Sequence, residues 1–137
     1  MKISLLLALC LSAFTFASEG SAATLKQNMK ALNGFFKQIS ADVNDPSKNA
    51  KSAEAADQMI KFYSPILDQV PDAVAQMPAP EREAALAEYK RIIQQQSKDA
   101  TALKEAFLAN DNAGAATLIQ RMNADKKDGH AKFRSQN

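Results

Sequence analysis

Residues 24–47 read TLKQNMKALNGFFKQISADVNDPS, and this stretch contains the signals of one complete amphipathic helix. Thr24 is a suitable N-cap, and apolar residues then recur every three or four positions as far as Val43. Pro46 cannot continue a helix, and it moves the preceding residue out of the helical region. The stretch therefore predicts a helix over residues 24–43, with an apolar stripe made by Leu25, Met29, Leu32, Phe36, Ile39 and Val43.

The same period of about 3.6 residues continues along the chain, which is rich in helix-forming residues and poor in glycine. We expect three further helices, over residues 47–69, 80–109 and 113–134, with a helical turn near residues 72–76. Pro65 should kink or shorten the second helix. Four helices of this length predict an all-α fold, an antiparallel up-down-up-down four-helix bundle.

The first residues have the pattern of a cleavable signal peptide. Lys2 precedes an apolar run over residues 3–16, and small residues follow. The run is too short and wrongly flanked for a membrane-spanning helix. We expect a signal peptide over residues 1–22 and one domain over residues 23–137, with cleavage after Ala17 or Ala23 as alternatives. A lipoprotein signal ending at Cys10 is a weaker alternative, because Leu9 is too large for the position before a lipidated cysteine.

Composition argues against several functions. The net charge is +2 with both signs interspersed, so we expect no nucleic-acid partner. No apolar run after the signal peptide has membrane length, so we expect no membrane insertion of the mature chain. A single histidine excludes zinc-protease motifs such as His-Glu-x-x-His, and we see no serine-histidine-acid arrangement in the sequence, so we expect no enzyme. Most carboxylates, such as Glu81, Glu83, Asp99 and Glu105, are expected on solvated helix faces beside lysines.

Two residues far apart in the chain form the candidate site. Met29 lies about five residues after the start of the first helix, and His130 lies about four residues before the end of the last. In an antiparallel arrangement these two depths coincide within about one helical turn. A methionine thioether facing an imidazole is an axial ligand pair for haem iron.

Simpler interpretations exist for both residues. His130 can be an exposed or capping histidine near a helix C-terminus, and Met29 can be a core filler. His130 follows Met122 by eight positions and precedes Phe133 by three, so we expect it on the buried stripe of the helix. Gly129 suggests close approach of a flat ligand to the backbone, or else a fraying last turn.

The residues that form this pair also resemble a known family. Leu25-x-x-Asn28-Met29-x-x-Leu32-Asn33 and His130-Ala131-Lys132-Phe133-Arg134 resemble the soluble cytochrome b562 family, a group of bacterial periplasmic proteins. The second segment is also similar to cytochromes c′, but the two cysteines of that family would fall at Lys126 and Gly129. The specific likeness is confined to the two ends of the mature chain.

The resemblance implies one non-covalent haem b per chain, with Met29 and His130 as axial iron ligands and Arg134 near a propionate. It further implies a periplasmic electron-transfer protein, which we expect to be a monomer served by redox partner proteins of unknown identity. Two alternatives remain: a haem-free or weakly haem-binding helical chaperone or stress-response binding protein, and a family member that buffers haem or binds gas. Lys126, Gly129 and Pro65 depart from the expected apolar pocket and regular helix.

Overall fold

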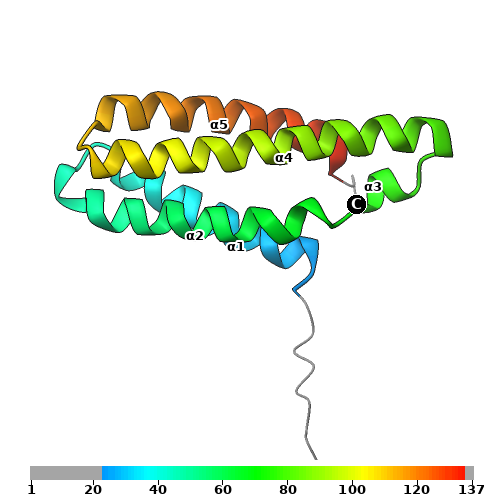
Figure 1. Ribbon diagram of the computed structural model, residues 1–137, viewed down its shortest axis with the longest axis horizontal. Coiled ribbons are helices and arrows are strands. Elements are labelled where there is room, and N and C mark those ends of the chain that lie inside the picture. Colours follow the sequence, from blue (N-terminus) through cyan, green and yellow to red (C-terminus); the bar gives the residue numbers. More distant parts are fainter. Residues whose placement is uncertain (1–22, 135–137) are drawn as a thin grey trace, which may run out of the picture.

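The computed structural model describes residues 23–134, and every regular element in that range is helical (Figure 1). The predicted all-α class is therefore confirmed for these residues, whereas the predicted signal peptide, residues 1–22, lies outside them. In chain order the elements are α1 (Leu25–Asp42), a 3-10 turn (Pro46–Lys48), α2 (Asn49–Leu67), α3 (Asp72–Ala75), α4 (Ala79–Leu108) and α5 (Asn112–Phe133).

Local sequence signals set the ends of α1. The Thr24 hydroxyl accepts a hydrogen bond from the Gln27 backbone N–H at 3.2 Å, and the Gln27 side chain accepts one from the Thr24 N–H at 2.8 Å. This reciprocal pair is a capping box, which satisfies backbone donors that have no partner within the helix. At the other end α1 stops before Val43, and Asp45 caps the 3-10 turn that begins at Pro46. The predicted bounds of the first helix are confirmed.

The other long helices lie close to their predicted positions. α2 passes through Pro65 and ends two residues later, at Leu67, so the expected shortening is confirmed. α3 is the helical turn expected in the proline-rich connection. α5 begins one residue earlier than expected, because Asp111 is its N-cap and accepts a hydrogen bond from the Gly114 N–H at 2.8 Å.

The four long helices lie side by side along the long axis of the molecule (Figure 1). α1 packs against α2, α2 against α4, and α4 against α5. The start of α1 and the end of α5 lie toward the same end, which we call the α3 end because α3 is also found there (Figure 1). The core between the helices includes the fully buried side chains of Ile39, Met59, Ile66, Leu103, Phe107 and Met122.

The helical period predicts that Ala56, Met59, Ile60, Tyr63, Leu67 and Val70 point inward from the second helix. Ala56, Met59 and Tyr63 are buried, and Ile60 and Leu67 are half-buried. The expectation that Val70 also points inward is wrong, since it is 44% exposed. Val70 follows the last turn of α2, so the helical period that placed it inward no longer applies. In the part of the chain that the structure describes, no helix is long and apolar enough to cross a membrane.

Candidate functional site

The two outer helices of the chain, α1 and α5, enclose a space that we call the α1/α5 seam. Unlike the other neighbouring pairs, these helices are not closely packed along their length. They are joined at the end opposite α3, where the Asn112 side chain donates to the Val43 carbonyl oxygen at 2.6 Å. Toward the α3 end, Lys126 Nζ lies 3.5 Å from Asn33 Oδ1. The seam is therefore bridged at intervals by side chains and stays open between them.

The contact between Lys126 and Asn33 sets the register of the two helices. Met29 lies four residues before Asn33 on α1, and His130 lies four residues after Lys126 on α5. Residues four apart share a helix face, and four residues advance a helix by about 6 Å. Because α1 and α5 run in opposite directions (Figure 1), both steps lead toward the α3 end. We infer from this register that Met29 and His130 lie at similar depth, on the sides of α1 and α5 that border the seam.

Met29 is half-buried and packs against the edge of the hydrophobic core. It follows Asn28, a buried residue whose side-chain amide donates to Gln69 Oε1 at 3.2 Å. Gln69 in turn donates to the Ala23 carbonyl oxygen at 2.9 Å. These bonds tie the first turn of α1 to the connection after α2, so the backbone that carries Met29 is held in place.

The expectation that His130 lies on the buried stripe of α5 is wrong. Met122 is completely buried and Phe133 is half-buried, but the imidazole of His130 is exposed. His130 lies four residues after Lys126, on the side of α5 toward the seam, where no helix of residues 23–134 packs closely. Partial burial nevertheless lowers the pKa of His130, and the positive charges of Arg134 and Lys126 lower it further. The neutral imidazole, which is the form that binds a metal, is thereby favoured.

Gly129 faces α4 rather than α1. A Cβ atom at this position would meet only Ile92 Cγ2, at an ordinary contact distance of 3.8 Å. Packing of the chain on itself therefore does not require glycine here.

Midway along the seam lies an open groove of about 400 Å³, which we call the seam groove. α1 contributes Phe36, Lys37 and Ser40 to its lining, and α5 contributes Ile119, Gln120, Asn123 and Lys126. The Lys126 ammonium lies 4.7 Å from the centre of the Phe36 ring, a cation–π contact. Apolar and polar groups thus line the groove together, and its charged groups are lysines.

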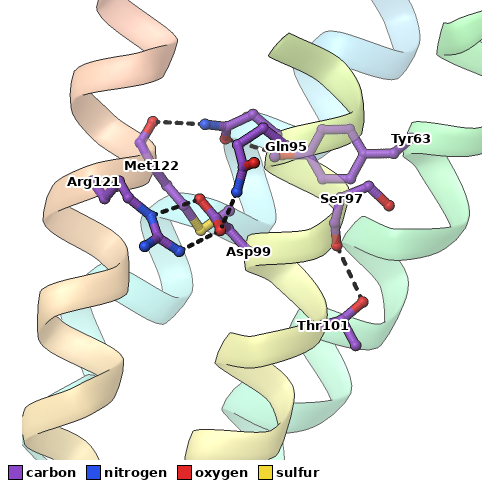
Figure 2. A network of polar contacts seen from close by, with 8 residues as sticks. Tyr63, Gln95, Ser97, Asp99, Thr101, Arg121 and Met122 are labelled. Atoms are coloured by element: carbon purple, nitrogen blue, oxygen red, sulfur yellow. Dashed lines mark hydrogen bonds and ion pairs between the residues drawn. The ribbon is translucent and has the colours of Figure 1, made fainter. Parts of the chain in front are cut away.

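A second cluster, which we call the Asp99 cluster, lies at the interface of α4 and α5 (Figure 2). Asp99 is only 2% exposed, and Arg121 donates two hydrogen bonds to its carboxylate, one of them from Nε at 3.0 Å. Gln95 Nε2 donates to the same carboxylate at 2.9 Å. The buried charge is therefore both paired and hydrogen-bonded, as a buried carboxylate must be.

The expectation that Asp99 belongs to a solvated face is wrong, and the sequence contained a signal for its burial. Leu103 and Phe107 follow Asp99 at intervals of four, so all three share the face of α4 that forms the core. Next to this cluster, Gln96 accepts a hydrogen bond from the Tyr63 hydroxyl at 3.4 Å and donates to the Met122 carbonyl oxygen at 3.3 Å. Burial raises the pKa of Tyr63, and the charge of Asp99 adds to that effect.

The Asp99 cluster has no histidine or cysteine, and its carboxylate is fully engaged by its donors. Nothing in its geometry provides a nucleophile beside a base. Within residues 23–134, no group of three or more His, Cys, Asp or Glu side chains is placed to hold a metal ion. An axial pair for haem iron would be a different kind of site, with two protein ligands from two helices.

Comparisons with protein-family models, with curated proteins and with solved structures found no match to this chain.

Proposed function

We propose that this chain is a periplasmic electron-transfer protein that binds one non-covalent haem b in the α1/α5 seam, at the α3 end. Met29 and His130 are the proposed axial ligands. The proposal includes an antiparallel up-down-up-down four-helix bundle and removal of residues 1–22 as a signal peptide. One observation supports it: Lys126 Nζ of α5 lies 3.5 Å from Asn33 Oδ1 of α1, each of these residues is four positions from a proposed ligand, and the two helices are not closely packed.

The residues at this position fit the proposed cofactor in their chemistry. Met29 presents a half-buried thioether from a fixed turn of α1, and His130 presents an imidazole whose lowered pKa favours the metal-binding form. His130 is exposed along the seam, where a ligand would cover it. Arg134 lies one turn after His130 and supplies a positive charge for a carboxylate at the rim.

Bound haem supplies a one-electron iron couple, and thioether ligation raises its reduction potential. Met29 and His130 would hold the iron from two separate helices. With both ligands supplied by the chain, no iron position would be left for a substrate, which favours electron transfer over catalysis. The helix backbones restrict movement of the two ligands between oxidation states.

A haem-free chaperone is the alternative from another class, and the surface does not favour it. Among the described residues, the exposed large apolar side chains are those of Val70 and Leu108. Val70 follows α2, toward the α3 end, whereas Leu108 ends α4 at the opposite end (Figure 1). A chaperone surface would gather such side chains into one extended patch.

The test is the absorption spectrum of protein purified after expression of the full chain and titrated with haemin. We expect saturation at one haem per chain, a low-spin spectrum with a sharp reduced α band, and no change on adding carbon monoxide to the reduced form. Met29→Ala and His130→Ala should each abolish the low-spin spectrum. Met77→Ala, at a half-buried methionine outside the seam, and Lys127→Ala, at an exposed neighbour of His130, are matched controls that should leave it intact.

Two results would contradict the proposal. One is a haem spectrum that neither ligand substitution alters. The other is a chain that takes up no haem and instead suppresses the aggregation of unfolded client proteins.

A further inference from the structure

Most of the seam groove lies away from the proposed axial pair, although Lys126 at its edge is one turn, about 6 Å along α5, before His130. Phe36 in its wall lies seven residues beyond Met29, which is about 10 Å along α1. Ile119 lies eleven residues before His130, which is about 16 Å along α5. At about 400 Å³ the groove falls within the range of small-molecule sites.

Lys126 lies at the edge of this groove and has no counter-charge among the described residues. Its ammonium contacts the Asn33 amide oxygen at 3.5 Å and the Phe36 ring at 4.7 Å. Within residues 23–134 it makes no ion pair with a carboxylate. Burial lowers the pKa of Lys126, and the charges of Lys37 and Lys127 lower it further. Each of these effects disfavours the charged form, and an anion placed beside Lys126 would reverse them.

The acidic side chains of α5 turn away from the seam. Asp128 pairs with Lys132 at 2.8 Å, and Lys132 also reaches Glu88 of α4 at 3.3 Å. Asp125 and Asp128 also contribute to raising the pKa of Arg91 on α4, after the larger effect of Glu88. Ion pairs thus join α5 to α4 at Arg121–Asp99 and Lys132–Glu88, whereas the seam groove has lysines from both of its walls.

The groove also has apolar side chains that could contact the hydrocarbon part of an amphipathic anion. Phe36 is almost completely buried beneath it, and Ile119 is half-buried on the opposite wall. Asn123 and Gln120 add amide groups that can donate hydrogen bonds to a head group. A ligand with an apolar chain and one negative end would match both kinds of lining.

We propose that the seam groove is a binding site for an amphipathic carboxylate, such as a medium-chain fatty acid. Lys126 and Lys37 hold its carboxylate, and its chain lies along Phe36 and Ile119. This inference goes beyond electron transfer and does not require haem.

The test is isothermal titration calorimetry of the purified protein with sodium decanoate, without added haem and below the critical micelle concentration. We expect saturable binding of one decanoate per chain. Decanol, which has the same chain and no charge, should bind at least about tenfold more weakly, since a charge-assisted contact contributes about 1.4 kcal/mol or more. Decanol binding as tight as decanoate would overturn the role of the lysines.

Single substitutions locate the site. Lys126→Met should weaken decanoate binding about tenfold and Lys37→Met severalfold, because each removes one positive charge and keeps an apolar side chain. Lys98→Met, at an exposed lysine of α4, is the matched control and should not change the affinity. Circular dichroism would verify that the variants are folded. Equal affinities in all three variants, or no saturable binding to the unsubstituted chain, would overturn the proposal while leaving the haem spectrum as a separate question.

Discussion

The two faces of α5 differ in whether the charged side chains on them are paired. Toward α4, Asp99 is buried and satisfied by Arg121 and Gln95, and the helices pack closely around it (Figure 2). Toward α1, Lys126 leans over an aromatic ring with no carboxylate partner in the described residues, and the helices stay apart. A buried charge that is paired within the chain contributes to the stability of the fold, because losing its partner would leave an uncompensated buried charge. A charge left unpaired at an open seam is available to a ligand.

The largest effect expected from this comparison is on packing. Met122→Ala removes a fully buried side chain of α5 and should lower the free energy of unfolding by about 3 kcal/mol. Ile119→Ala, one turn away on the seam side, removes a half-buried side chain and should cost about 1 kcal/mol. Urea denaturation followed by circular dichroism measures both. Equal losses would mean that the seam is packed as tightly as the α4/α5 interface.

Breaking the Asp99 cluster should have the next largest effect. Arg121→Met leaves a buried carboxylate with only Gln95 as a side-chain donor and should destabilise the protein by about 2 kcal/mol. The expected loss is below that of a fully buried pair, because Arg121 is itself half exposed. Lys126→Met removes an unpaired charge and should change stability by less than about 0.5 kcal/mol.

The same urea titrations measure this pair of variants. The double variant Asp99→Asn, Arg121→Met should recover part of the loss caused by Arg121→Met, because it no longer leaves a buried charge. Failure to recover would show that the geometry of the cluster, rather than its charge balance, determines the cost.

The smallest effect concerns the titration of His130, the only histidine of the chain. Its pKa should lie below 6.5, because burial and the charges of Arg134 and Lys126 all disfavour the protonated ring. Arg134→Gln and Lys126→Met should each raise the pKa toward 6.5. Lys132→Met, whose lysine is paired with Asp128, should leave it nearly unchanged. NMR titration of the imidazole Cε1 proton measures the pKa of His130 in the unsubstituted chain and in these three variants.

The sign of the accompanying stability change follows by linkage. A histidine whose pKa is lower in the folded state binds its proton more weakly there than in the unfolded chain. Stability from this group is therefore complete above pH 6.5 and declines as the pH falls through 6.5 toward the folded-state pKa. A rise in stability over that same fall in pH would contradict the assigned surroundings of His130.

Helix positions were predictable from the sequence by itself, because they depend on residues that are close together in the chain. The capping box of Thr24 and Gln27 joins positions three apart, and Pro46 and Pro65 act on their own turns. The similar depth of Met29 and His130 follows from the lengths of the helices once they are taken as antiparallel. Their proposed role as ligands stays a prediction.

Only the tertiary structure decided which helix faces meet and how closely. It showed that Asp99 is buried beside Arg121, that His130 is exposed, and that α1 and α5 leave a groove beside Lys126. The helical period places residues on a face, but a face becomes interior only where a neighbouring helix covers it. That covering depends on interhelical distances set by side chains far apart in the sequence. Local patterns therefore located the helices of this protein, and packing decided which of their charges were paired.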